Sequence, residues 1–291
     1  MCGGYLSVSA FDKRAADIVY NEFARLNKLF NFYDCQSELS RLNRTFNVPV
    51  KVSPELLELL NISAQVNQIT NGAFDVSCGS LFEYWKKLIK SKNVTALPPP
   101  QEIAALKEKC GMQYVLIDNK RSTVTIKKEG LKIDLGGLAE GYMVDKTVQK
   151  LKGAGIDMAL IDSGGDIYCL GQNRTAPWRV GIENPGVNSL VARELIQDEA
   201  ITTAGDYEQF FIFKGKKYSH IISPQTGFPV DNNVVMVTVI AKNCVTADAL
   251  DTAFMVMGED GVKEFLNKRP STLRIFMLLK EKRGTRIAIF K

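Results

Sequence analysis

Two carboxylates and a hydroxyl, Asp248, Asp251 and Thr252, recur at helical spacing in the C-terminal third of the 291-residue chain. Residues three and four apart lie on the same side of a helix. A cluster made only of oxygen atoms suits a hard ion such as Mg²⁺. In the competing interpretation, Thr246 caps this helix and the aspartates complement its dipole. The spacing leaves both interpretations open.

The single histidine, His220, opens the segment HIISPQTGFP at residues 220–229. A histidine that leaves a strand and enters a Gly/Pro loop is better placed for proton transfer than for packing. Its usual pKa of roughly 6.5 suits a general base near neutral pH. Because the chain has no second histidine and no Cys/His cluster, zinc, iron and copper are poor candidates. A lone surface histidine is also often inert.

Two glycine-containing loops precede these residues. The segment DLGGLAEG at residues 134–141 lies between an expected strand and an expected helix. Its glycines let the backbone approach a ligand, and the helix N-terminus favours a phosphate, although a plain tight turn remains the alternative. For DSGGD at residues 162–166, we expect a hairpin turn rather than a binding loop.

Together, a phosphate cradle, a hard-metal cluster and one base fit chemistry on a pyrophosphate. In such chemistry a metal bridges phosphate oxygens while a base prepares a hydroxyl for attack. Acyl transfer by a Ser-His-Asp triad is less favoured, because the chain contains no GxSxG motif.

The elements that must position these groups follow from hydrophobic periodicity and breaker residues. Apolar residues at helical spacing predict helices at residues 12–30, 53–71, 81–90, 138–151 and 247–257, with a short one ending at Cys110. Alternating apolar residues predict strands at 5–9, 114–117, 123–127, 159–161, 167–170, 179–182, 210–213, 218–222, 234–240, 273–279 and 286–290. Many short strands with segregated helices indicate an α+β fold with mixed or antiparallel sheets.

Composition excludes several classes of protein. Hydrophobic residues make up 45% and charged residues 24%, which excludes wholesale disorder. No apolar run reaches the roughly 18 residues of a transmembrane helix. Lys+Arg 37 against Asp+Glu 32 gives a net charge of +5, and the scattered basic residues give no footprint for nucleic acid. The six cysteines form no CxxC pair, and we expect free thiols.

The chain resembles the bacterial FAD:protein FMN transferases of the ApbE family over nearly its whole length. The resemblance rests on the number and order of seven motifs. They are SELSRLN at 37–43, GAFD at 72–75 ahead of Trp85, DLGGLAEGYMVD at 134–145, SGGDI at 163–167, AGDY at 204–207, HIISPQTGFP at 220–229 and ADALDT at 247–252.

This resemblance implies one T-fold-like α+β domain over residues 1–291, helix-rich in 1–110 and strand-rich in 111–291. It also implies Mg²⁺-dependent transfer of FMN from FAD to a threonine or serine hydroxyl of a target flavoprotein, with release of AMP. By resemblance, Mg²⁺ is held by Gly137, Asp248, Asp251 and Thr252, and His220 is the base. The implied flavin-nucleotide contacts are Met1, Tyr33, Asn43, Ala73, Phe74, Asp75, Asp134, Glu140 and Ile222.

Three positions depart from the family pattern. Glu140 stands where many members have lysine, Ala204 replaces a common serine, and the familiar Met-Gly-Thr start is Met1-Cys2-Gly3. No leader precedes this start, so we expect a cytoplasmic protein, or a periplasmic or membrane-anchored one if a leader was trimmed. The alternatives to transfer are an Mg²⁺-dependent FAD pyrophosphatase and a flavin-binding protein without turnover.

Overall fold

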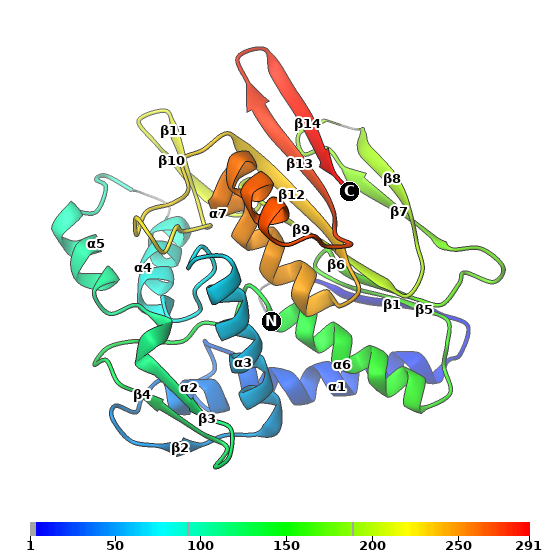
Figure 1. The fold of residues 1–291 in the computed structure, drawn as a ribbon, viewed down its shortest axis with the longest axis horizontal. Helices are drawn as coiled ribbons and strands as arrows, with labels where there is room; N and C mark the ends of the chain where they lie inside the picture. The colour runs from blue at the N-terminus through cyan, green and yellow to red at the C-terminus, as the bar shows by residue number, and fades with distance from the viewer. Residues whose placement is uncertain (1–3, 92–93, 188) are drawn as a thin grey trace.

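A seven-stranded antiparallel sheet forms the centre of the protein in a computed structural model that describes residues 4–91, 94–187 and 189–291. Its strand order is β1-β5-β6-β9-β12-β13-β14 (Figure 1). These strands are β1 (Leu6–Ala10), β5 (Ala159–Ser163), β6 (Asp166–Leu170), β9 (Glu199–Gly205), β12 (Val234–Ala241), β13 (Arg274–Glu281) and β14 (Gly284–Phe290).

The two faces of this sheet are covered by different partners, and β12 shows how the sequence specifies this. Val237, Val239 and Ala241 belong to the main hydrophobic core, whereas Met236 and Ile240 belong to a second cluster, as the two-residue period of a strand requires. On the first face lie α6 (Ala139–Gly153) and α7 (Cys244–Lys268), with α1 (Arg14–Phe30) packed on α6. The hairpin of β7 (Trp178–Glu183) and β8 (Leu190–Ile196) covers the second face.

The remaining elements pack beside the helical face. They are α2 (Glu38–Leu42), α3 (Pro54–Ile69), the 3₁₀ turn Met112–Tyr114 and a small sheet of β2 (Val50–Lys51), β4 (Thr123–Ile126) and β3 (Val115–Asp118). A third cluster around Trp85 joins α4 (Gly79–Lys90), α5 (Pro100–Lys107) and the hairpin of β10 (Phe210–Phe213) and β11 (Lys216–Ser219). In Figure 1, α4 and α5 lie on the same side of the molecule as this hairpin.

The α+β prediction is confirmed, and most predicted elements are present within a few residues of their expected bounds. The strand expected at residues 218–222 ends at Ser219. The helix expected at 247–257 begins at Cys244 and continues to Lys268, with a kink at Gly258, whose φ is 70°. Strands β8 and β9 and the short α2 and β2 were not predicted.

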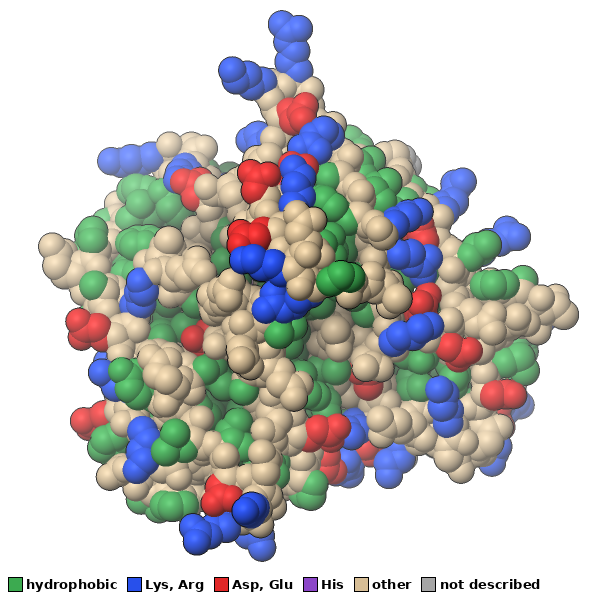
Figure 2. Space-filling view, viewed as in Figure 1, with side chains coloured by type: hydrophobic (Ala, Val, Ile, Leu, Met, Phe, Trp, Pro, Cys, Tyr) green, Lys and Arg blue, Asp and Glu red, His purple; other side chains and the backbone are tan. Residues whose placement is uncertain are grey.

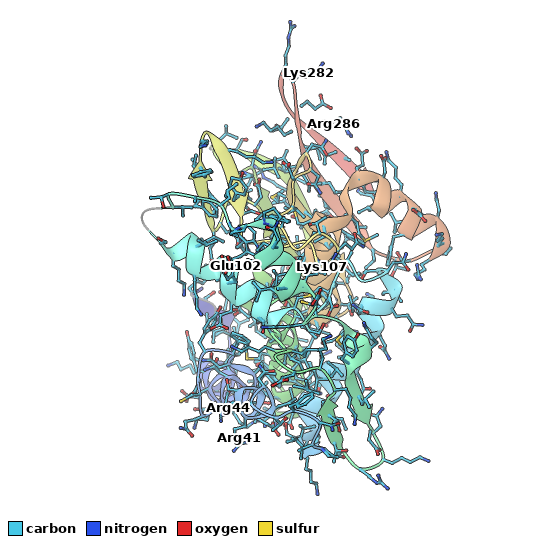
Figure 3. The ribbon with its side chains drawn as sticks, turned by 90° about the vertical axis from the view of Figure 1, so that its left-hand side faces the viewer. Arg41, Arg44, Glu102, Lys107, Lys282 and Arg286 are labelled. Atoms are coloured by element: carbon cyan, nitrogen blue, oxygen red, sulfur yellow. The ribbon has the colours of Figure 1, made fainter. Side chains whose placement is uncertain are left out.

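Charged side chains of both signs are interspersed on the face shown in Figure 2. Arg286 of β14 shows the local pattern, because it pairs with Glu259 at 2.6 Å and with Glu281 at 2.8 Å. From the side, the β13–β14 hairpin projects from the body with Lys282 at its end (Figure 3). No helix among the described residues is long and apolar enough to span a bilayer. The cysteines of the described ranges are free, as expected.

Candidate functional site

A cavity of about 360 Å³ lies among the glycine loop, the segment after α3, the end of β11 and the middle of α7, within the usual size of small-molecule sites. Most of the residues that the sequence indicated line it. These are Ala73, Phe74, Asp75, Asp134, Gly137, Glu140, His220, Ile222, Asp248, Asp251 and Thr252. The two glycine loops, the histidine loop and the acidic helix, which are distant in the sequence, therefore converge on one space.

The acidic side of the cavity is formed by α7. Asp248 and Asp251 are buried, at 7% and 2% exposure. Burial raises the pKa of Asp248 to about 8, and the nearby charges of Glu140 and Asp145 add to this effect. Burial and the charge of Asp248 likewise raise the pKa of Asp251. Thr252 donates to Asp251 Oδ1 at 3.3 Å. Two buried carboxylates that repel each other are a costly arrangement unless a cation compensates them.

The start of α7 shows that these aspartates do not serve the helix dipole. The carboxylate of Asp145 in α6 accepts hydrogen bonds from the backbone N–H groups of Cys244 and Val245, at 2.8 and 2.9 Å. The helix therefore begins before Thr246, and its first turn contains no acidic residue. The interpretation of Thr246 as the N-cap is wrong, because a carboxylate about 100 residues earlier in the chain takes that role.

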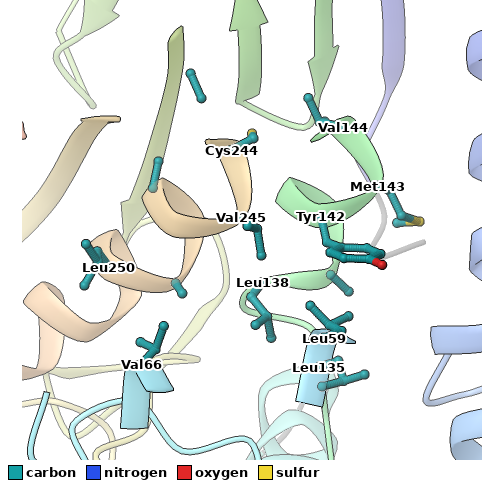
Figure 4. Packing of buried hydrophobic residues seen from close by; sticks show 14 of the residues in the cluster. Leu59, Val66, Leu135, Leu138, Tyr142, Met143, Val144, Cys244, Val245 and Leu250 are labelled. Carbon is teal, nitrogen blue, oxygen red and sulfur yellow. The ribbon is translucent and has the colours of Figure 1, made fainter. Parts of the chain in front are cut away.

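Close packing of α6 against α7 fixes the acidic side relative to the glycine loop. A Cβ on Gly141 would lie 2.6 Å from the carbonyl oxygen of Cys244 and 2.9 Å from Cβ of Asp248. The Gly141 N–H donates to Asp248 Oδ2 at 3.0 Å. Figure 4 shows the apolar part of this contact, with Val245 beside Tyr142 and Leu138. Only glycine permits this approach at position 141.

Hydrogen bonds of Asp134 and Asn43 fix the start of the glycine loop. Asp134 Oδ1 accepts from the Gly136 N–H at 2.9 Å. The preceding residue, Ile133, is clamped by Asn43, whose amide donates to its carbonyl at 2.8 Å and accepts from its N–H at 2.7 Å. Asn43 is not among the described residues that line the cavity; it contacts the backbone of the residue that precedes Asp134.

One further predicted contact is not among the described residues that line the cavity, and another lies outside the described residues. Tyr33 is 54% exposed, and its ring lies 5.3 Å from the Lys86 ammonium and 5.4 Å from that of Lys90. Because Lys86 lines the cavity, Tyr33 lies next to the cavity rather than in it. Met1 is outside the described residues.

His220 follows the end of β11, and its geometry fixes the tautomer. Its Nδ1 lies 3.1 Å from the carbonyl oxygen of Gln209. Since a carbonyl only accepts, Nδ1 carries the proton and Nε2 has the free lone pair. Burial lowers the pKa of His220, and the charge of Lys86 lowers it further, against the opposing effect of the Gln209 bond. The imidazole is therefore neutral at pH 7 and able to accept a proton.

The loop after His220 is anchored by α4 and α5. The indole N–H of buried Trp85 donates to the Gly227 carbonyl at 2.8 Å, and Lys107, labelled in Figure 3, donates to the Gln225 carbonyl. Gly227 has a φ of +80°, and a Cβ there would lie 2.8 Å from the Ile103 side chain. These contacts hold the segment that carries His220 against two helices.

A model of the ApbE family matches residues 3–277 of the chain. The chain belongs to the ApbE family. It is 37% identical over 239 residues to an FAD:protein FMN transferase of Vibrio cholerae, covering 81% of this chain and 71% of the relative. It is 32% identical over 278 residues to one of Escherichia coli, covering 92% and 78%.

Solved structures of the ApbE family have the same fold. The flavin transferase ApbE from Vibrio cholerae superposes with a TM-score of 0.86 at 30% identity, covering 99% of this chain and 94% of that one. The ApbE protein of Thermotoga maritima gives 0.85 at 31% identity, covering 98% and 91%.

Asp166 and Lys86 are among the cavity residues of this ApbE-family chain that sequence reasoning missed as site residues. Asp166 lines the cavity at the end of the Asp162–Asp166 turn. That segment is the hairpin turn we expected, with Gly164 and Gly165 both at positive φ, and it contributes to the cavity as well. Lys86 of α4 is the one lysine or arginine among the described residues that line the cavity. Its position next to Trp85 was the only signal in the sequence.

The described residues contain no group of three or more His, Cys, Asp or Glu side chains arranged to hold a metal ion. The predicted Mg²⁺ set contains only two such side chains, Asp248 and Asp251. Its other donors are the hydroxyl of Thr252 and the backbone of Gly137, which packs beside that threonine: a Cβ at 137 would lie 3.7 Å from Thr252 Oγ1.

Proposed function

We propose that this ApbE-family chain is an FAD:protein FMN transferase. It moves FMN from FAD to a threonine or serine hydroxyl of a target flavoprotein, requires Mg²⁺ and releases AMP. The observation that carries this proposal is that a neutral histidine and a pair of buried aspartates line one cavity. Family membership and the names of the relatives support the flavin substrate.

The residues present fit a bound Mg²⁺. Asp248, Asp251, the Thr252 hydroxyl and the Gly137 backbone offer oxygen donors only, as this ion prefers. The cavity also has Asp75, Asp134, Glu140, Asp166 and Glu208 in its lining, against one lysine among the described residues. A negatively charged pyrophosphate would be repelled by such a wall. When bound, the ion offsets this charge and polarises the phosphate oxygens.

His220 performs the proton transfer. The acceptor hydroxyl gives its proton to Nε2 as its oxygen forms a bond to the FMN phosphorus. The bond between this phosphorus and the oxygen bridging to the AMP phosphate breaks, and AMP leaves with the bonding electrons. The Gln209 carbonyl stabilises the imidazolium through the Nδ1 hydrogen bond, much as an orienting acceptor does for other catalytic histidines.

Apolar and polar side chains of the cavity bind different parts of the nucleotide. Phe74 and Ile222 are almost fully buried yet line the cavity, so they offer apolar surface to a flat ring system. Asp134, fixed through Ile133 by the Asn43 clamp, offers a carboxylate oxygen to hydroxyl or amino donors of the nucleotide.

The test incubates the protein with FAD, Mg²⁺ and a candidate target flavoprotein, followed by mass spectrometry of the denatured target. FMN covalently bound to a threonine or serine, together with free AMP, supports the proposal. Asp251→Asn and EDTA should each abolish the adduct. Free FMN with no adduct on any candidate target would instead identify an FAD pyrophosphatase. FAD that stays intact would identify a flavin-binding protein and overturn the proposal.

A further inference from the structure

We propose that Lys86 of α4 binds the pyrophosphate of FAD. Its ammonium is then the positive charge that the protein itself supplies to this anion. This inference rests on the proposed function, because it assigns a role in binding the same substrate. It starts from charge: Lys86 is the one lysine or arginine among the described residues lining a cavity that includes seven carboxylates. A substrate with two adjacent negative charges finds its one fixed positive partner there.

The surroundings of Lys86 favour a phosphate contact. Its ammonium lies 3.9 Å from Asp134 Oδ2, which is longer than a hydrogen bond of 2.7–3.2 Å. The pair is therefore a Coulombic contact, and a phosphate oxygen at hydrogen-bond distance from the ammonium would lie closer to it than Asp134 Oδ2 does. The Lys86 side chain is 23% exposed, so a bound phosphate would be partly shielded from water, where a charge-assisted hydrogen bond is stronger.

Lys86 is also held at a fixed place relative to the reacting groups. The preceding residue, Trp85, is buried and bonded to Gly227 in the loop that follows His220. The Tyr33 ring lies 5.3 Å from the ammonium on the outer side and limits its freedom by a cation–π contact. The charge of Lys86 reaches His220, whose pKa it lowers. A phosphate beside Lys86 would thus lie near the proton acceptor.

The same helix offers a matched control. Lys90 lies one turn further along α4, and its ammonium lies 5.4 Å from the same Tyr33 ring. Lys90 is exposed and is not part of the described cavity lining. It therefore shares the helix, the ring contact and the charge of Lys86, and lacks the position in the cavity.

The experiment is isothermal titration of ADP and of riboflavin into the wild-type protein, Lys86→Gln, Lys86→Arg and Lys90→Gln, all with Mg²⁺. ADP carries a pyrophosphate and cannot donate FMN, whereas riboflavin carries no phosphate. We expect Lys86→Gln to weaken ADP binding by about 10-fold to 100-fold, as loss of a charge-assisted hydrogen bond does, and to leave riboflavin binding unchanged. Lys86→Arg and Lys90→Gln should bind both ligands nearly as the wild type does.

Three results would overturn the inference. The first is that Lys86→Gln binds ADP as the wild type does. The second is that Lys86→Gln weakens ADP and riboflavin binding equally, which would indicate a structural role for the lysine. The third is that Lys90→Gln weakens ADP binding as much as Lys86→Gln does, which would indicate a general effect of surface charge. The proposed function is judged separately, by the FMN adduct on the target. Wild-type protein that binds ADP through Lys86 and never modifies a target would refute only the function, and wild-type protein that modifies a target while Lys86→Gln binds ADP as tightly would refute only the inference.

Discussion

Replacing Gly141 by alanine should force apart the two helices that form the site. The new Cβ would lie 2.6 Å from the carbonyl oxygen of Cys244, whereas ordinary contact begins near 3.4 Å. The obstacle is backbone, which cannot rotate away, so α6 and α7 must separate by several tenths of an ångström. Alanine gains up to about 1 kcal/mol in helix propensity, but overpacking of this kind costs about 1–3 kcal/mol or more.

After this gain is subtracted, we expect Gly141→Ala to lower the free energy of unfolding by up to about 2 kcal/mol. With an unfolding entropy of about 2.1 cal/mol/K per residue, this corresponds to a fall in Tm of up to roughly 3 °C. The loss of activity should be larger than the loss of stability alone would explain, because the Asp248 carboxylate moves with α7. This carboxylate accepts a hydrogen bond from the Gly141 N–H. Misplacing a reacting geometry by about 1 Å can cost about 100-fold in rate, so we expect a loss of about 10- to 100-fold in kcat/KM.

The control is Gly153→Ala at the end of the same helix, where a Cβ meets nothing within 4 Å. Without an obstacle, only the propensity gain remains, and this variant should keep its activity and melt at or above the wild-type temperature. Thermal denaturation and the FMN-transfer assay measure both variants. A Gly141→Ala protein that is as stable and as active as Gly153→Ala would refute the inferred tight contact between α6 and α7.

The remaining predictions concern single groups of the site. His220→Ala should lower kcat by about 100-fold or more and leave the Kd for FAD nearly unchanged, because a general base acts in the chemical step; a loss confined to Kd would contradict this role. In the wild type, kcat/KM should fall on acidification only below the usual histidine value of about 6.5, since burial and Lys86 lower the pKa of His220 and only the neutral ring accepts a proton; a midpoint above that value in a pH–rate profile would be inconsistent with this environment. Asp251→Asn should melt higher than wild type in EDTA, because it removes a buried charge beside Asp248, and should lose the rise in Tm that Mg²⁺ gives the wild type; a wild-type-like Mg²⁺ shift would remove Asp251 from the metal set. Asn43→Ala should lower the free energy of unfolding by about 1–3 kcal/mol, as measured in urea, because it leaves both backbone groups of Ile133 without their partner; unchanged stability would show that the clamp is dispensable.

The elements with a strong local pattern could be predicted from the sequence, and those set by distant contacts could not. Helix α3 has a capping serine, a first-turn proline and a Gly stop, and its predicted start at Ser53 matches the structure. Strand β9, Glu199–Gly205, has mostly small and hydroxyl-bearing residues. It was missed because its place beside β12 in the sheet, rather than its own pattern, specifies it.

The site shows the same division. Motifs on loops, such as residues 134–141 and 220–229, could be located from their glycines and the lone histidine. The start of α7 could not, because the cap comes from Asp145 on another helix. Lys86 sits among other lysines in the sequence of α4, and only its place next to Trp85 distinguishes the one that lines the cavity. Asn43 was predicted as a nucleotide contact, and its hydrogen-bond partner in the structure is Ile133, a contact that only the fold reveals.

The hydrogen bond between Trp85 and Gly227 has a consequence for the shape of the acceptor. It ties the helix bearing Lys86 to the loop bearing His220, so two walls of this part of the cavity are linked directly. Under the proposed function, walls linked in this way favour an acceptor hydroxyl on a narrow, protruding segment of its protein, such as a loop tip or an exposed turn, over one on a broad surface.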